Sequence, residues 1–305
     1  MAESTIDLSV RTPEPAPAEQ EQSPDRAARL RAGARRRLRS WLRQPGLVLA
    51  VLVLLTVLAW ALAPGLFAPR DPLRADPAHI FEPPGPGAWF GTDYLGRDLY
   101  SRVVHGASLS LRAPVVAVAL GLVSGTTVGL LAGALGGWVD ALLMRAVDVL
   151  LAIPGILVSL AVVTALGFGT VHVAVAVGLA SLPGFARITR AQVLRVLGEP
   201  YVEAATASGV RRPVVLLTHV LPNVRGPVLS LAALELGTAV LAVAALGFLG
   251  FGAQPPTPEW GSMVSEGRDY LGDYWWFTTL PGLTLALVTL SVNRIARSVT
   301  HRRTH

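Results

Sequence analysis

The uncharged stretch Val149–Ala186, VLLAIPGILVSLAVVTALGFGTVHVAVAVGLASLPGFA, decides the fold class of this 305-residue chain. It runs for 38 residues without a charge when His172 is neutral. About 20 helical residues cross a bilayer core, so this stretch is too long for one crossing. The Gly-Phe-Gly-Thr turn at 167–170 predicts its division into two helices. Pro154-Gly155 predicts a kink in the first of them, which neighbouring helices in a bundle can tolerate.

Other apolar runs predict four further crossings, at residues 46–68, 113–138, 226–253 and 274–293. Hydrophobic residues make up 52% of the chain and charged residues only 15%. We therefore expect an all-α membrane protein with six transmembrane helices. The expected segments are a disordered and basic N-terminus (1–45), a first anchor (46–68), an extramembrane segment (69–112), a transmembrane domain (113–297) and a tail (298–305).

Composition excludes several kinds of site. The chain has no cysteine, which rules out disulfides and thiolate metal ligands. Its six histidines are scattered, and it has no phosphate-binding loop of the GxxxxGK[ST] type. We expect no catalytic residue, no metal site and no cofactor in this chain, so it should not be an enzyme.

Arginine placement predicts the orientation in the membrane. Six crossings put both termini on one side, and 20 of the 26 basic residues, all arginine, fall in the segments of that side. An excess of basic residues marks cytoplasmic loops, so we expect both termini in the cytoplasm. Arg26–Arg43 is expected to lie as an amphipathic helix against membrane lipid. This asymmetry explains the net charge of +6 without nucleic acid.

The stretch EAATASGVRRPVVLLTHVLPN, Glu203–Asn223, is too polar and too interrupted to span a bilayer. Pro200 suits the start of a short helix, and Glu203 in its first turn favours the positive helix end. Gly209 is expected to turn the chain. The residues alone leave two functions open, a connector that covers the end of the bundle and a socket for a partner.

A second short helix is expected to begin at Pro213 and to stop at Leu221-Pro222. Val214, Leu217 and Leu221 are spaced by three and four residues, which predicts an apolar face on this helix. Together the two helices form a helix-turn-helix on the cytoplasmic side.

This stretch resembles the cytoplasmic "EAA" loop of ABC importer permeases. Three further blocks resemble the dipeptide/oligopeptide/nickel group of these permeases. They are Phe90–Arg112 (FGTDYLGRDLYSRVVHGASLSLR), Gly136–Pro154 (GGWVDALLMRAVDVLLAIP) and Leu246–Tyr270 (LGFLGFGAQPPTPEWGSMVSEGRDY). The likeness covers about residues 40–295. One departure is His219, where the family pattern usually has an aliphatic residue.

The resemblance implies a type I importer transmembrane domain whose EAA loop docks on a separate ATPase subunit. The residues that it implies for this contact are Glu203, Ala204, Ala205, Gly209, His219, Leu221 and Pro222. The implied partners are a homologous permease, two ATPase subunits that hold ATP and magnesium, and an extracytoplasmic solute-binding protein. The implied solutes are dipeptides or oligopeptides, with nickel or another solute as an alternative. An ion-coupled secondary transporter is a further alternative.

Two groups of charged residues remain. Glu235 interrupts an apolar run, so it should line a cavity, meet a partner subunit or reach the cytoplasmic interface. Asp140, Arg145 and Asp148 could form a proton relay, but we expect a structural ion pair at the cytoplasmic edge, because Arg145 and Asp148 stand one helical turn apart and can pair.

Overall fold

The computed structural model describes residues 44–301. All of its described helices belong to the second of two compact units, Pro45–His305. The predictions for the disordered, basic N-terminus with its surface helix, and for residues 302–305 of the tail, fall outside the described residues.

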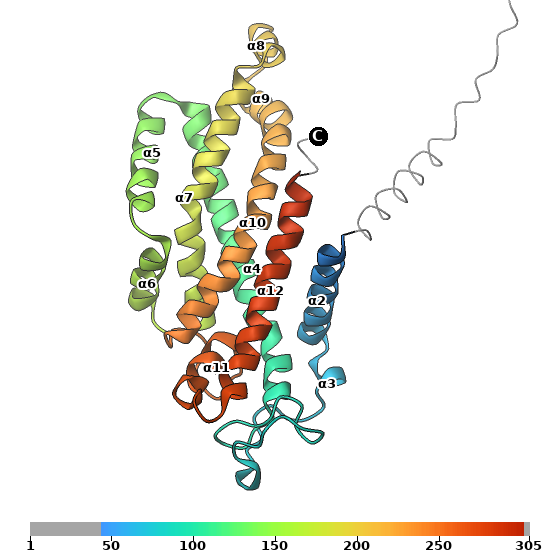
Figure 1. Ribbon diagram of the computed structural model, residues 1–305. Helices are drawn as coiled ribbons and strands as arrows, with labels where there is room; N and C mark the ends of the chain where they lie inside the picture. The colour runs from blue at the N-terminus through green and yellow to red at the C-terminus, as the bar shows by residue number, and fades with distance from the viewer. Residues whose placement is uncertain (1–43, 302–305) are drawn as a thin grey trace, which may run out of the picture. The chain divides into compact units, whose positions relative to one another are not determined.

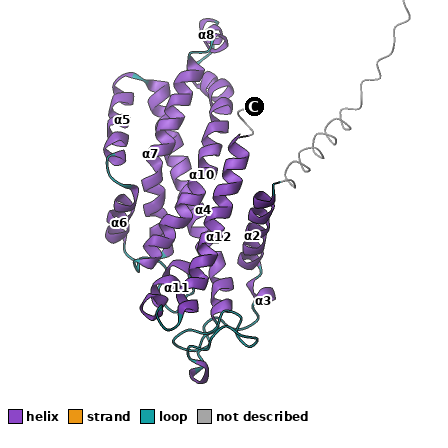
Figure 2. Ribbon diagram, viewed as in Figure 1, coloured by secondary structure: helices purple, strands orange, loops and turns teal. Residues whose placement is uncertain are grey.

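The described residues form helices joined by short loops (Figure 2). In chain order they are α2 (Pro45–Leu62), α3 (Pro64–Phe67), η1 (Pro77–His79), α4 (Leu99–Leu135), α5 (Gly137–Leu151), α6 (Gly155–Leu166), α7 (Thr170–Leu197), α8 (Pro200–Ala207), α9 (Arg212–Val215), η2 (Leu216–Val220), α10 (Leu221–Phe248), α11 (Trp260–Gly267), η3 (Arg268–Tyr270) and α12 (Trp275–His301). The prediction of an all-α protein is confirmed for this part of the chain.

Five helical stretches of the described chain are long and apolar enough to cross a membrane: α2, α4, α7, the continuous run Arg212–Phe248 and α12. α5 and α6 satisfy the same criteria only as a pair, bent by 94° at the break between them. Counting this pair as one broken span gives the predicted six crossings. The predicted kink at Pro154-Gly155 is therefore a full break, and the predicted turn at 167–170 separates α6 from α7.

The long helices run side by side, with α8 and α11 at opposite ends of the bundle (Figure 1). We call these ends the α8 end and the α11 end. α5 and α6 pack along the outer side of α7, and α2 packs against α4 and α12.

Glycines at every fourth position bring α4 and α7 into direct contact. Gly121, Gly125, Gly129 and Gly133 form a stripe on α4 that faces α7. A Cβ added at Gly125 would lie 2.6 Å from Cβ of Phe185 and would also strike the carbonyl oxygen of Leu182. Small residues are what membrane helices use to let their backbones approach.

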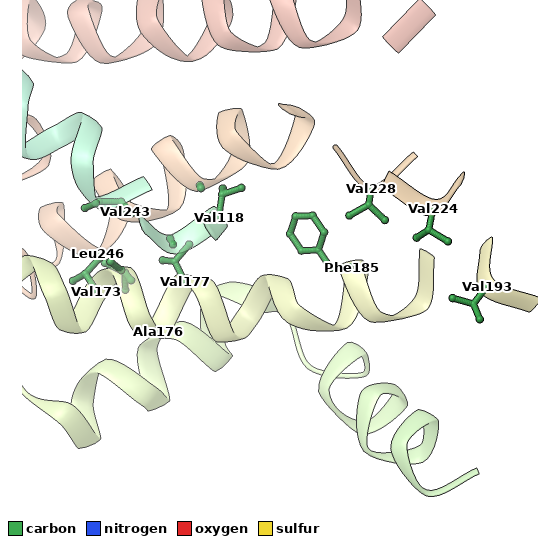
Figure 3. Packing of buried hydrophobic residues seen from close by; sticks show 14 of the residues in the cluster. Val118, Val173, Ala176, Val177, Phe185, Val193, Val224, Val228, Val243 and Leu246 are labelled. Carbon is green, nitrogen blue, oxygen red and sulfur yellow. The ribbon is translucent and has the colours of Figure 1, made fainter. Parts of the chain in front are cut away.

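Valine-rich side chains fill the space where α4, α7 and α10 meet (Figure 3). Phe185 of α7 is fully buried there, between Val118 of α4 and Val228 of α10. Side chains packed in this way hold α10 in a fixed position relative to the α4–α7 pair.

α4 begins at Leu99, well before the uncharged run that starts at Ala113. The Asp98 side chain caps it by accepting a 2.9 Å hydrogen bond from the backbone N–H of Ser101. Arg102, in the first turns, is fully buried against Glu266 of α11, with Arg102 Nη2 3.2 Å from Glu266 Oε2. The first turns of α4 can carry charged residues because other parts of the protein, rather than lipid, surround them. The uncharged run in the sequence therefore covers only the later part of this helix.

Buried polar groups join α11 to α4 at the α11 end. The Trp260 indole donates a 2.9 Å hydrogen bond to the carbonyl oxygen of Val103, and its backbone N–H donates to Ser110 Oγ. Glu259 caps α11 by accepting from the backbone N–H groups of Gly261 and Ser262. Burial raises the pKa of Glu259, and it also raises the pKa of Glu266 against the opposing effect of Arg102. These contacts fix the α11 end of the bundle.

The predicted pairing of Arg145 with Asp148 is wrong. Asp148 instead binds Arg187 of α7, with 2.7 Å between Arg187 Nη2 and Asp148 Oδ1. Asp140 binds Arg190 of α7 through both carboxylate oxygens, at 2.5 and 2.6 Å. Because α5 packs along α7, each of these carboxylates lies next to an arginine of the neighbouring helix. The pair of Asp140 and Arg190 is bidentate, and two parallel hydrogen bonds fix the geometry of an ion pair better than one.

Candidate functional site

A short helix-turn-helix extends the α8 end of the bundle (Figure 1). Its first helix, α8, has Pro200 in the first turn, where a missing N–H costs nothing. Glu203 also lies in this first turn, as predicted from the sequence. Val202 is 1% exposed and anchors α8 to the valine-rich core. The rest of the helix is thereby free to present its outer side.

The turn after α8 is closed by two backbone hydrogen bonds. The N–H of Gly209 donates to the carbonyl oxygen of Thr206 at 3.0 Å, and the N–H of Val210 donates to that of Ala205 at 3.2 Å. This is the Schellman arrangement, which requires a left-handed residue at the position of Gly209. Gly209 has φ +86°, as its predicted role in the turn demands.

The second helix does not stop at Leu221-Pro222, contrary to the prediction. α9, η2 and α10 form one continuous helical run from Arg212 to Phe248. η2 is a π-helical turn in which the N–H of Leu221 donates to the carbonyl oxygen of Leu216. A proline inside an α-helix clashes with the carbonyl four residues earlier, and the wider turn makes room for Pro222. The helix-turn-helix is therefore joined directly to a membrane-crossing helix.

Three side chains tie α8 to this second helix. Asn223 Nδ2 donates to the hydroxyl oxygen of Tyr201 at 3.1 Å and to the carbonyl oxygen of His219 at 2.7 Å. The rings of Tyr201 and His219 meet edge to face, with 5.9 Å between their centres. The two helices are thus linked by the Gly209 turn and by this side-chain contact.

Most residues singled out from the sequence lie on the outside. Glu203, Ala204, Gly209, Leu221 and Pro222 are exposed, whereas Ala205 and His219 are half-buried. Of these residues, His219 contacts the first helix, through the ring of Tyr201.

The predicted apolar face of the second helix points away from the bundle. The exposed fractions are 45% for Val214, 66% for Leu217 and 40% for Leu221. Its packing against the core is made instead by Val215 and Val220, which are at most 3% exposed. Val214, Leu217 and Leu221 consequently form an apolar strip that a partner protein could cover.

Sequence reasoning missed the role of Tyr201 and Asn223. The two residues are 22 positions apart, and no spacing rule connects positions on either side of a turn of unknown geometry. The polar Asn223 just after Leu221-Pro222 was the available signal. A polar side-chain amide at the start of a membrane-crossing helix needs a hydrogen-bond partner, and Tyr201 is one of the partners that Asn223 has.

Glu235 lies midway along α10, and its side chain is half-buried. Its Oε2 atom accepts a 3.0 Å hydrogen bond from the hydroxyl of Thr238, which lies one turn further along the same helix. A charged residue at the bilayer centre costs about 3 kcal/mol on insertion scales. Glu235 is separate from the helix-turn-helix, so the bundle carries two distinct candidate positions.

The helix-turn-helix offers an exposed surface with several small or apolar side chains. Within the described part of the chain, no three His, Asp or Glu side chains are grouped so that they could hold a metal ion. What the arrangement provides is a short exposed element whose second helix is continuous with α10.

A bundle of membrane-crossing helices of this kind defines an integral membrane protein. The chain belongs to the family described as the binding-protein-dependent transport system inner membrane component, whose model matches residues 125–305. It is therefore a permease of the inner membrane and not an enzyme.

Its relatives include peptide transport proteins. It is 40% identical over 260 residues to a di/tripeptide transport system permease protein of Pseudomonas aeruginosa, covering 83% of this chain and 86% of the relative. It is 39% identical over 251 residues to a dipeptide transport system permease protein of Alkalihalophilus pseudofirmus, covering 81% and 82%. It is 38% identical over 256 residues to a glutathione transport system permease protein of Pectobacterium atrosepticum, covering 84% and 85%.

Among solved structures, the fold is similar to that of an amino acid ABC transporter crystallised with histidines. The TM-score is 0.52, the sequence identity is 14%, and the match covers 67% of this chain and 94% of the other. This likeness shows the fold.

Proposed function

We propose that this chain is one of two permease subunits of an ATP-driven importer for dipeptides or oligopeptides. In this function it pairs with a homologous permease, and the pathway lies between them. Two ATPase subunits dock at the α8 end and hold ATP and magnesium, while this chain holds no cofactor. A solute-binding protein delivers peptide at the α11 end.

The observation that carries this proposal is the exposed helix-turn-helix joined to α10. The chain has no phosphate-binding loop, so in this proposal the energy of ATP enters through a contact with another protein. Glu203, Ala204 and Gly209 are exposed on the projecting element, and small side chains let a partner surface approach closely. Because the run from Arg212 to Phe248 is continuous, a displacement of its first turns at α9 would pass along α10 into the bundle.

The arginine distribution supports the orientation. Arg187, Arg190 and Arg195 lie in the half of α7 nearest α8, and Arg211 and Arg212 lie in the helix-turn-helix itself. Cytoplasmic segments carry the excess of basic residues, so the α8 end is assigned to the cytoplasm. Both chain termini lie on that side in this proposal.

The peptide assignment rests on the relatives. Those aligned over more than four fifths of this chain are named for dipeptide, di/tripeptide or glutathione transport. All of these solutes carry a free ammonium group and at least one carboxylate. Nickel or another small solute is the alternative within the same importer class, and ion-coupled transport is the alternative of another class.

Deletion of the gene should abolish uptake of one solute class. Radiolabelled dipeptide, radiolabelled pentapeptide and nickel would be offered in parallel to cells with and without the gene. We expect dipeptide or pentapeptide uptake to fall at least tenfold and to return on complementation. A fall in nickel uptake alone would contradict the peptide assignment. Unchanged uptake of all three solutes, in a strain lacking other peptide importers, would contradict it as well.

A further inference from the structure

We propose that Glu235 and Thr238 form a water-exposed, cation-attracting position on the transport pathway, where the ammonium group of a passing solute is held. This inference rests on the proposed importer function and adds a site within the membrane to it. The chemistry that it would recognise is a primary ammonium group, such as the N-terminus of a peptide or a lysine side chain.

The first step is the depth of Glu235. α10 runs from Leu221 to Phe248, so Glu235 lies about 20 Å along the helix axis from either end. A glutamate side chain spans only a few ångströms and cannot carry its charge from there to the membrane surface. The predicted alternative in which Glu235 reaches the cytoplasmic interface is therefore disfavoured by its position.

The second step is the lack of a counter-charge. None of the ion pairs among the described residues includes Glu235. Within residues 44–301, its carboxylate accepts a hydrogen bond only from Thr238 of its own helix. Two other carboxylates of the bundle, Asp140 and Asp148, each bind an arginine of α7.

The third step is the surface around Glu235. Thr238 is exposed, and Ala242 and Ala245 continue the same side of α10 with small side chains. Val240 and Val243 are at most 4% exposed and lie on the packed sides of the helix. This face is only partly exposed, since Ala242 packs against the core and Glu235 is half-buried. A carboxylate and a hydroxyl on such a face are expensive in hydrocarbon but stable beside water. This face is therefore expected to line an aqueous route rather than lipid.

The fourth step concerns what the position can do. An unpaired carboxylate beside water in a low-dielectric setting attracts cations and raises their local concentration. The solutes of the relatives carry an ammonium group, which is the complementary charge. Thr238 holds one carboxylate oxygen, and the other remains available to the solute.

Single cysteines test this position cleanly because the chain contains no natural cysteine. Thr238→Cys would be introduced into the full transporter in native membranes, with its partner subunits present. It would be treated with a trimethylammonium thiosulfonate or with a sulfonate thiosulfonate, and labelling of the purified chain would be followed by mass. Leu55→Cys, at an exposed position of α2, serves as the lipid-facing control.

We expect Thr238→Cys to react with both reagents while Leu55→Cys stays unlabelled. We also expect the cationic reagent to react about tenfold faster at Thr238→Cys, relative to the ratio of the two reagents on a free thiol. In the double variant with Thr238→Cys and Glu235→Gln, the faster reaction of the cationic reagent should disappear while labelling by both reagents continues. Failure to label Thr238→Cys would overturn the proposal, because the face would then meet lipid or a partner subunit. Labelling without a charge preference would overturn it too.

Uptake of charged dipeptides provides a second test of the role of Glu235. At concentrations that saturate wild-type uptake, the binding protein is fully loaded, so differences arise in the membrane. Glu235→Gln should lower the maximal uptake of a lysine-containing dipeptide several-fold more than that of a glutamate-containing one. Equal losses, together with poor recovery of the partner permease on purification, would identify a subunit contact instead. Cysteine labelling needs no transport, so failure of the proposed function would be recognised separately.

Discussion

Gly125→Leu is expected to prevent the bundle from forming. Even a Cβ at this position would lie 2.6 Å from Cβ of Phe185 and 3.1 Å from the backbone nitrogen of Ala186. Backbone atoms of a helix cannot move aside singly, so α4 and α7 would have to separate along the glycine stripe. Overpacking a core costs about 1–3 kcal/mol even where side chains can shift. Since 1.4 kcal/mol is a factor of ten in an equilibrium constant, a cost of about 3 kcal/mol lowers the folding equilibrium constant roughly a hundredfold, and we expect the yield of folded protein to fall.

The amount of folded protein would be measured by size-exclusion chromatography in detergent with a fluorescent tag, together with the thermal midpoint. Ala119→Leu is the matched control, because Ala119 lies on the exposed side of the same helix. We expect the control to behave as wild type and Gly125→Ala to be intermediate. Normal yield and thermal midpoint for Gly125→Leu would show that the α4–α7 contact is not required for the fold.

Gly209→Trp is expected to stop transport while leaving the protein in the membrane. Nothing lies within 4 Å of a Cβ placed at Gly209, and the residue is exposed, so the side chain starts into open space. The left-handed backbone adds a strain of about 1–2 kcal/mol, which a well-packed bundle can bear. The bulky side chain would instead occupy the surface where the ATPase subunit is proposed to dock. We expect at least a tenfold loss of solute uptake.

The matched control for this change is Gly137→Trp. Gly137 also has a positive φ, +53°, and open space around its Cβ, and it is exposed at the turn between α4 and α5. Gly137→Trp introduces the same backbone strain and the same bulky side chain as Gly209→Trp, but at a position outside the helix-turn-helix. Membrane amounts would be compared by immunoblot and uptake by radiolabelled solute. Wild-type uptake by Gly209→Trp would refute the role of this surface in coupling.

Much of the fold could be predicted because the membrane imposes it. The lengths of uncharged runs predicted the crossings, and Gly167 and Gly169 predicted the turn between α6 and α7. What hydropathy could not predict is where a helix continues among polar residues. α4 starts at Leu99 because Arg102 is buried against another part of the protein. That contact is between residues 164 positions apart and leaves no local signal.

In the candidate site too, local features could be predicted from the sequence, whereas features that depend on contacts between distant residues could not. Local rules placed α8 and the Gly209 turn correctly, because helix starts and left-handed turns depend on a few adjacent residues. The stop predicted at Leu221-Pro222 was wrong, because a π-helical turn removes the proline clash and lets the helix run on. The pairing of Asp148 with Arg187 likewise depends on two helices meeting, so neighbouring residues alone suggested the wrong partner.

The most direct measurement is solute accumulation in vesicles reconstituted with this chain, its homologous permease, the ATPase subunits and the binding protein. A radiolabelled dipeptide would be added on the side of the binding protein, with ATP and magnesium on the side of the α8 end. We expect accumulation that requires ATP hydrolysis and is unaffected when proton and sodium gradients are collapsed. Accumulation driven by an imposed proton or sodium gradient without ATP would contradict the assignment as an ATP-driven permease.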